Sequence, residues 1–218
     1  MRYEWLDDYL LKKRGVTKDY QPVWNWIRYH IGGKMFAALC LDKAGEVYYI
    51  NLKLEESESA LLRGQYADIL PGYYSDKRCW VSVKPDGTVP DELLRTMLDK
   101  SYGLTLAGMS KKARRQALGL TACGLECADC PLYQGDCPGC NECGGRVFHA
   151  SPGKPCPLYA CAVNRKHRTG CGGCADAPCA LWEQVRDPAL SEEEFRASVA
   201  ARLKNLNEMP EIGRRGQE

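Results

Sequence analysis

The feature that most constrains the fold of this 218-residue chain is the uneven placement of its 13 cysteines. Cys40 and Cys79 precede residue 115, whereas the other eleven lie between Cys123 and Cys179. One uniform core would not divide the thiols in this way, and a disulfide-rich secreted miniprotein would carry them along its whole length. The cysteine distribution therefore predicts two parts of different construction.

The cellular compartment decides how a dense cysteine cluster is read. The sequence begins MRYEWLDDYLLKKRG, without an apolar run of signal-peptide length, and no segment approaches the ~20 apolar residues of a membrane span. We therefore expect a cytoplasmic protein with no membrane partner. In a reducing cytosol, clustered cysteines indicate metal or iron–sulfur ligands before disulfides.

The spacing of the eleven clustered cysteines supports metal binding. The pattern C-x2-C occurs four times, and it lets two thiolates reach one metal from a tight turn. Few large aliphatic residues accompany them, so bound metal would have to supply folding free energy. The predicted ligands are Cys123, Cys127, Cys130, Cys137, Cys140, Cys143, Cys156, Cys161, Cys171, Cys174 and Cys179.

The spacing leaves the identity of the metal open. The run Cys137-x2-Cys140-x2-Cys143 matches the first three ligands of a bacterial ferredoxin pattern, but the fourth cysteine does not follow it three residues later. C-x2-C pairs from separate segments are also how zinc ribbons are built. The predicted cofactor is therefore Zn²⁺ or an iron–sulfur cluster, and the two histidines of this region, His149 and His167, are expected at the surface.

Residues 121–186 resemble a family of short Cys-rich modules of unknown function. The resemblance is carried by CGLECADC, CPGC, CPLYACAV and CGGCADAPCALW, in that order. It implies metal or iron–sulfur binding without an established reaction. Cys143 lies outside these four blocks.

The first 115 residues have the pattern of an α+β domain. Helical spacing of apolar residues alternates with short β-branched and aromatic runs that end in turn signals. Strands followed and preceded by helices predict a two-layer fold, an antiparallel sheet with flanking helices. Helices are expected at 3–13, 55–66 and 91–102, and strands at 24–31, 34–41, 46–52 and 77–83.

The remainder of the chain is expected to be a small metal-stabilised Cys-rich module and a C-terminal helix. Residues 110–120 form a basic helix or linker at the boundary, 180–185 a short helix, and Ser191 with Glu194 is a helix N-cap signature. The predicted divisions are 1–115, an α+β domain; 116–189, the Cys-rich module; 190–209, the C-terminal helix; and 210–218, a disordered tail.

The α+β part resembles the MmcQ/YjbR family. The segments IGGKMFAALCL, INLKLE, ILPGYYSDKRCWVSV and LLRTMLDKSYGLTLAGMSKKAR carry the resemblance, which covers about residues 1–115. It implies a compact two-layer α+β fold, and its members are often described as DNA-binding-like. Tyr74, Asp76 and Cys79 stand where the family commonly has His, Asn and His, so a shared catalytic role does not carry over.

Two groups of cations are candidate binding residues for an anion or nucleic acid. Lys34, Lys53, Lys77 and Arg78 would line one face together with Trp80, and Lys111, Lys112, Arg114 and Arg115 form a basic run. The alternatives are a core Trp80 with solvated cations and a solvated linker helix. The net charge of +2 does not itself indicate a nucleic-acid partner.

No arrangement of nucleophile, base and acid is recognisable, so no catalytic residue is predicted and the chain is expected not to be an enzyme. Trp24, Trp26, Met35 and Cys40 are expected in the core. The predicted function is binding or sensing, with a Zn or Fe–S module attached to an interaction domain whose protein partner is unknown. The alternatives are an Fe–S electron-transfer or reductase accessory protein and a nucleic-acid-binding regulator.

Overall fold

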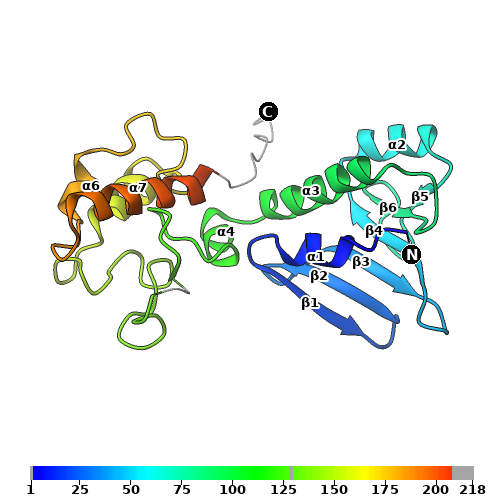
Figure 1. The fold of residues 1–218 in the computed structure, drawn as a ribbon, viewed down its shortest axis with the longest axis horizontal. Coiled ribbons are helices and arrows are strands. Elements are labelled where there is room, and N and C mark those ends of the chain that lie inside the picture. Colours follow the sequence, from blue (N-terminus) through cyan, green and yellow to red (C-terminus); the bar gives the residue numbers. More distant parts are fainter. Residues whose placement is uncertain (1, 128–129, 208–218) are drawn as a thin grey trace. The chain divides into compact units, whose positions relative to one another are not determined.

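The computed structural model describes residues 2–127 and 130–207, which form two compact units. The N-terminal unit ends at Met109 and the C-terminal unit begins at Ser110. This division falls before the boundary expected at residue 115, because the basic helix packs into the C-terminal unit. Figure 1 shows the sheet and helices of the first unit and the loop-rich second unit.

The N-terminal unit is an α+β fold built on an antiparallel sheet. The strand order is β1-β2-β3-β4-β6-β5, and every neighbouring pair is antiparallel. Its elements are α1 (Leu6–Leu11), β1 (Val16–Gln21), β2 (Trp26–Ile31), β3 (Lys34–Leu41), β4 (Val47–Lys53), α2 (Glu56–Gln65), β5 (Ile69–Pro71), β6 (Trp80–Val83) and α3 (Asp91–Ala107).

One face of the sheet is covered by α1 and α3. Tyr29 on β2 is buried and donates its hydroxyl hydrogen bond to Asp7 of α1. Tyr9 of α1 donates in turn to Asp99 of α3, at 2.6 Å, so the two helices lie on the same side. Side chains alternate along a strand. Trp26, three residues before Tyr29, therefore points to the opposite face.

That opposite face carries a second, smaller apolar cluster. Trp26, Ala38 and Cys40 form its buried part, and Tyr48, Tyr49, Tyr73 and Met35 pack around them. Trp26 and Cys40 are direct cross-strand partners, which places both side chains on one face. The loop between β5 and β6 supplies Tyr73, and among the described residues no helix contributes to this cluster.

The sequence pattern predicted most of these elements and missed two strands. The strand at Lys34–Leu41 has the expected bounds, and the helices near 3–13, 55–66 and 91–102 are present. β1 was missed because five of its six residues are polar or exposed at an edge of the sheet. β5 was missed because three residues are too few to show a period.

The C-terminal unit is assembled mainly from turns and short helices (Figure 1). Ser110 caps the first helix by accepting a hydrogen bond from the backbone N–H of Ala113. The elements are α4 (Lys111–Ala117), α5 (Pro157–Tyr159), the π-helical turn η2 (Ala160–Arg165), α6 (Ala180–Gln184) and α7 (Glu192–Asn207). The turn of helix at 157–165 was not predicted.

An apolar core runs through this unit and corrects the expectation that metal alone would hold it. Its large members include Trp182 of α6 and Phe195, Val199 and Leu206 of α7, which pack with Leu158. Four of these five residues follow Cys179, so counting aliphatic residues within the cysteine segment underestimated the core. The C-terminal helix is therefore part of the Cys-rich unit and not a separate segment.

The start of α7 confirms the predicted capping signature. The Ser191 hydroxyl accepts from the Glu194 N–H, and the Glu194 carboxylate accepts from the Ser191 N–H at 2.9 Å, so each residue satisfies a free donor of the other. The predicted tail at 210–218 lies outside the described residues. Among the helices that the structure describes, none is long and apolar enough to cross a membrane.

Candidate functional site

Six of the eleven predicted ligands line one small pocket in the C-terminal unit. The pocket has a volume of about 60 Å³, and apolar side chains such as Leu125, Val147 and Phe148 complete its wall. His149 also lines it and is exposed, as the sequence pattern predicted. The six cysteines are Cys123, Cys127, Cys130, Cys137, Cys140 and Cys156.

Tight turns bring these cysteines together from distant positions in the chain. The backbone N–H of Cys130 donates to the carbonyl of Cys127, which closes the first C-x2-C turn. Gly145 donates to the carbonyl of Cys140 and accepts from the N–H of Cys156, both at 2.8 Å. The link through Gly145 therefore ties the second C-x2-C segment to a cysteine 16 positions later.

Backbone N–H groups point at the sulfur atoms of three of these thiols. The N–H of Cys140 donates to Cys127, and the N–H of Ala122 donates to Cys140. The sulfur of Cys156 receives the N–H groups of Leu158 and Tyr159 at the start of α5. Such donors favour the thiolate form and are the usual surroundings of sulfur ligands.

Burial acts in the opposite direction on the same thiols. Desolvation raises the pKa of Cys127, Cys140 and Cys156 above the ordinary value of 9.0. The negative charge of neighbouring cysteine sulfurs raises the pKa further, since like charges oppose each other's ionisation. Without a bound metal, these three thiols are therefore protonated at neutral pH.

Four further cysteines, Cys161, Cys171, Cys174 and Cys179, form a second group. Cys171 is buried, and desolvation together with the charges of Cys123, Cys179, Cys174 and Cys161 raises its pKa to about 12. Cys123 thus interacts with members of both groups. Beside this second group, Lys166 reaches the sulfur of Cys174 at 3.8 Å.

The side-chain geometry is looser than that of a formed metal centre. Within residues 2–127 and 130–207, no three His, Cys, Asp or Glu side chains converge tightly enough to hold a metal ion. Cys143 is half-buried and lies outside the six-thiol pocket. Donor type and number fit a thiolate-bound metal, whereas convergence of the sulfurs would require adjustment of the turns that carry them.

The predicted cationic face of the N-terminal unit is partly assembled. Lys53 and Trp80 are direct cross-strand partners on β4 and β6. Lys34 at the start of β3 is exposed, and its ammonium group donates to the carbonyl of Gly108 at 3.4 Å. Lys77 and Arg78 are exposed in the β5–β6 loop.

Arg78 forms an ion pair with Asp76, which lowers the charge that this face presents. The Arg78 guanidinium lies 3.1 Å from the Asp76 carboxylate, and this hydrogen bond holds the pKa of Asp76 below its usual range. Asp76 therefore stays ionised and offsets Arg78 at neutral pH.

The basic run in α4 contains one residue that contradicts its predicted role. Arg115 is 3% exposed and donates through Nε to the side chain of Asn141 at 2.8 Å. Its guanidinium also reaches the carbonyl of Thr169 at 3.3 Å. Arg115 is thus an internal tie of the C-terminal unit and is not available to a nucleic acid.

The other three cations of the run differ in exposure. Lys111 and Lys112 are exposed, and Arg114 is half-buried. Lys111 donates to the carbonyl of His167. Only part of the predicted basic surface is therefore presented to solvent.

One of the residues expected in the core is exposed. Trp24 was expected in the core, but it is 51% exposed at the rim of an aromatic pocket. Trp26 and Cys40 are buried as expected, and burial raises the pKa of Cys40 to about 12. Trp24 lies in the turn before β2, which begins at Trp26. A turn residue outside the strand need not be buried, and its position before the strand was the signal in the sequence.

Comparison with known proteins places the N-terminal unit. The YjbR family model matches residues 11–104. The uncharacterised protein YbdF of Escherichia coli O157:H7 is 33% identical over 88 residues, which cover 40% of this chain and 70% of YbdF. The chain belongs to the YjbR family. The uncharacterised protein YyaQ of Bacillus subtilis (strain 168) is 37% identical over 67 residues, 31% of this chain and 56% of YyaQ.

The match defines a YjbR domain inside the N-terminal unit. The crystal structure of Deinococcus radiodurans protein DR2400, with the family-model domain DUF419, aligns with 28% identity and a TM-score of 0.47, over 53% of this chain and 86% of that one. The family model and the identity to YbdF confirm the predicted MmcQ/YjbR resemblance for residues 11–104. The resemblance of residues 121–186 to a Cys-rich family stays a prediction.

Proposed function

We propose that this protein is a binding or sensing protein whose C-terminal unit holds Zn²⁺ or an iron–sulfur cluster through thiolates, attached to a YjbR domain that serves as an interaction module. The observation that carries the proposal is the pocket lined by six cysteines from three separate stretches of the chain, 123–130, 137–140 and 156. In a reducing compartment, a cluster of six thiols around one pocket favours metal ligation over disulfides.

The donor set supports either metal. Four thiolates complete a tetrahedral zinc site, and iron–sulfur clusters are likewise held by four cysteines. The pocket would supply them from Cys123, Cys127, Cys130, Cys137, Cys140 and Cys156. Cys161, Cys171, Cys174 and Cys179 would supply a second set. The backbone N–H groups at Cys127, Cys140 and Cys156 would stabilise the thiolates once their protons leave.

The two metals would give the protein different roles. Zn²⁺ has no redox chemistry, so a zinc site would fix the turns of the C-terminal unit and shape a surface for a partner. A cluster would exchange electrons, and its potential would respond to the N–H donors around the sulfurs. In that case the protein would act as a redox sensor or as an electron-transfer accessory to a partner.

The deciding experiment is metal analysis of the full-length protein purified without oxygen. Iron, zinc and acid-labile sulfide are measured per chain, and the visible spectrum is recorded. Stoichiometric iron and sulfide with visible absorbance would support the cluster, and stoichiometric zinc in a colourless protein would support the structural metal. Protein that binds neither metal, also after anaerobic reconstitution, would refute the proposal.

Two substitutions separate the pocket from the other thiols. Cys140→Ser removes a buried thiol of the pocket and should lower the metal content, whereas Cys79→Ser in the N-terminal unit should leave it unchanged. Circular dichroism of both variants verifies that the fold survives. Equal metal content in the two variants would contradict the assignment of the pocket.

A further inference from the structure

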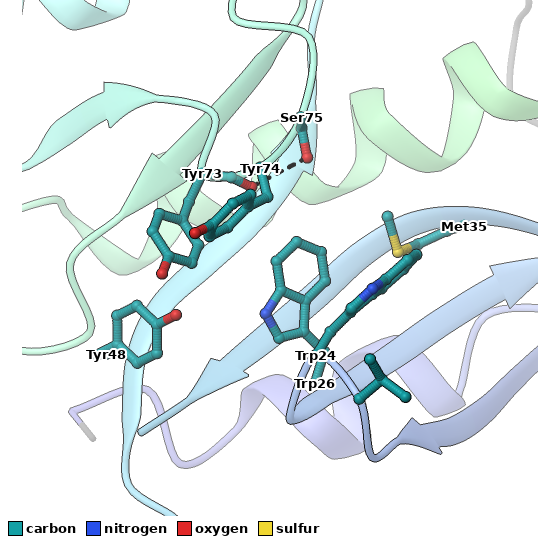
Figure 2. A pocket seen from close by; sticks show the side chains of 8 residues that line it. Trp24, Trp26, Met35, Tyr48, Tyr73, Tyr74 and Ser75 are labelled. Carbon is teal, nitrogen blue, oxygen red and sulfur yellow. Dashed lines mark hydrogen bonds between the residues drawn. The ribbon is translucent and has the colours of Figure 1, made fainter. Parts of the chain in front are cut away.

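A second pocket lies in the N-terminal unit, on the face of the sheet opposite α1, and the thiols have no part in it. Its volume of about 510 Å³ falls in the range of small-molecule sites. Figure 2 shows tyrosine rings along one side and two indoles with a methionine along the other. The residues lining this aromatic pocket are Val23, Trp24, Trp26, Met35, Tyr48, Tyr73, Tyr74 and Ser75.

Separate segments of the chain contribute the walls. The turn between β1 and β2 provides Trp24, the start of β2 provides Trp26, and β4 provides Tyr48. The loop between β5 and β6 folds over the open face and provides Tyr73 and Tyr74. The pocket therefore exists only in the folded sheet and has no contiguous sequence motif.

Buried polar groups hold the β5–β6 loop in place. Asn51 and Ser82 are fully buried on adjacent strands, where apolar side chains would be expected. The amide of Asn51 donates to the carbonyl of Tyr73 at 2.9 Å, and the hydroxyl of Ser82 accepts from the N–H of Tyr73 at 2.8 Å. Both backbone groups of Tyr73 are thus fixed, and with them the position of its ring.

Two residues of the rim have backbone conformations that side chains seldom adopt. In the described part of the N-terminal unit, Asn25 and Tyr74 are the non-glycine residues with left-handed φ, at 56° and 48°. Asn25 is held by donating to the carbonyls of Leu41 and Asp42. Strain of this kind concentrates at binding sites, because the surrounding structure must maintain it.

The lining is uncharged and dominated by aromatic faces. Every residue that lines the pocket is neutral, and five of the eight carry aromatic rings. The Tyr48 hydroxyl interacts with the Trp26 indole and the Tyr73 hydroxyl, and burial is the largest of the influences that raise its pKa. Tyr48 therefore stays neutral, and a ligand meets ring faces and hydroxyl oxygens rather than fixed charges.

The angles between neighbouring rings distinguish two kinds of ligand. A flat aromatic ligand requires a slot between parallel rings, but Tyr48 and Tyr73 meet at 86° and Tyr73 and Tyr74 at 80°. Trp24 and Trp26 meet at 65°. Trp26 and Tyr73 are inclined at 38°, but their centroids lie 6.4 Å apart, which is less than the about 7 Å that a flat ring sandwiched between them needs. Rings set at steep angles present several faces to one central volume, and this is the arrangement that binds a compact cation by cation–π attraction.

Trp24 already makes a cation–π contact with a side chain of the protein. The Arg28 guanidinium lies 5.6 Å from the centroid of Trp24. Asp19 binds Arg28 through two hydrogen bonds, at 2.9 and 2.7 Å, and so neutralises its charge. Arg28 therefore does not bring a net positive charge to the pocket.

We propose that the aromatic pocket binds an organic cation of the quaternary-ammonium or methylated-amine class. The steep ring angles select a rounded ligand over a flat one, and the absence of charged lining residues leaves cation–π attraction as the source of affinity. The YjbR domain would then be a small-molecule or methylated-side-chain binding module. The ligand would enter past Trp24 and Tyr74, which are 51% and 83% exposed.

The test compares two probes of nearly equal shape on the full-length protein. Choline carries a quaternary ammonium, and 3,3-dimethylbutan-1-ol replaces its nitrogen with carbon. Binding is followed by calorimetry and by the NMR shifts of the indole N–H groups. We expect saturable choline binding that shifts the Trp24 and Trp26 signals, and about tenfold weaker binding of the neutral probe.

Variants at the rim assign the binding to the pocket. Trp24→Ala and Tyr74→Ala should each weaken choline binding about tenfold, because each removes one aromatic face. Both side chains are largely exposed, so the fold should be preserved. Leu61→Ala removes an exposed apolar side chain of α2, 59% exposed and outside the pocket, and should leave binding unchanged.

Several outcomes would overturn the proposal. These are equal affinity for choline and the neutral alcohol, absence of saturable choline binding, or unchanged choline binding in Trp24→Ala and Tyr74→Ala. Adenosine serves as the flat probe, and preferential binding of adenosine over choline would show that the rings open into a stacking slot. None of these results depends on the metal content of the C-terminal unit.

Discussion

Ser82→Ala tests whether a buried hydrogen-bond pair positions the aromatic pocket. The Ser82 hydroxyl donates to the side-chain amide oxygen Oδ1 of Asn51 at 2.6 Å and accepts from the N–H of Tyr73 at 2.8 Å. The substitution keeps the side-chain size nearly constant and leaves both of these partners without their bond. Asn51 is fully buried, so water does not easily replace the lost hydroxyl.

The expected loss of unfolding free energy follows from the two buried groups that lose their hydrogen-bond partner, the Asn51 side-chain oxygen and the Tyr73 N–H. A buried donor or acceptor left unsatisfied costs about 1–3 kcal/mol. Two such groups at one site are not independent, and we expect Ser82→Ala to lower the free energy of unfolding by about 2–4 kcal/mol. Because the N–H of Tyr73 loses its anchor, we also expect weaker choline binding than in the unsubstituted protein.

Ser59→Ala is a matched control. Ser59 is as buried as Ser82, but its hydroxyl has no hydrogen-bond partner among the described residues. It lies inside α2, where alanine is the better helix former. Removing this hydroxyl should change the free energy of unfolding by less than about 0.5 kcal/mol or raise it slightly.

The assay is urea unfolding of the full chain followed by tryptophan fluorescence. Four of the five tryptophans precede residue 109, so the signal reports mainly on the N-terminal unit. Choline titration of each folded variant supplies the second readout. Equal stability of Ser82→Ala and Ser59→Ala would refute the reasoning, as would a destabilised Ser82→Ala that binds choline with full affinity.

Three further predictions concern other parts of the chain. Gly72→Ala should cost about 1–3 kcal/mol of unfolding free energy in urea titration, since its Cβ would lie 2.6 Å from the Cβ of Trp80; an unchanged midpoint would contradict this. Trp182→Ala should cost about 3–5 kcal/mol in the C-terminal unit, measured by hydrogen exchange, because it removes a fully buried ring; a loss confined to the N-terminal unit would exclude that role. The N–H and hydroxyl of Thr88 donate to Asp68 and lower its pKa from 3.8, so Asp68 stabilises the fold above that pH and loses this contribution in more acidic solution. Melting curves of Asp68→Asn and the unsubstituted protein should therefore converge at acid pH and differ at pH 7, and a constant difference would exclude this linkage.

The thiol pattern did not show which apolar residues pack the C-terminal unit together. Spacing left the grouping of the eleven cysteines open, and the fold places six of them, Cys127 and Cys140 included, around one pocket. The weak core inferred for the cysteine segment was wrong, because Trp182 and Phe195 pack into it from later in the chain. Sequence counts within a segment do not register apolar residues that return from outside it.

The basic run shows why charge alone does not identify a binding surface. Lys112 and Arg115 both carry a positive charge, yet Arg115 is buried against Asn141 and Lys112 is exposed. On a helix, residues three positions apart are neighbours on one side, so spacing does not distinguish Lys112 from Arg115, and only packing decides which of them is covered. The sequence therefore offered four candidate cations, and the fold buries one of them, Arg115.

The sequence by itself determined the local elements and the chemistry available in each half. Periods of apolar residues specify helices and strands over short distances, and cysteine spacing specifies which thiols share a turn. Only the tertiary structure decided that Trp24 lies at an exposed rim, that the Tyr73 loop covers the open face of the sheet, and that α7 completes the core of the Cys-rich unit. These features join residues far apart in the chain, and long-range packing and register follow from the balance of the whole fold rather than from any local pattern.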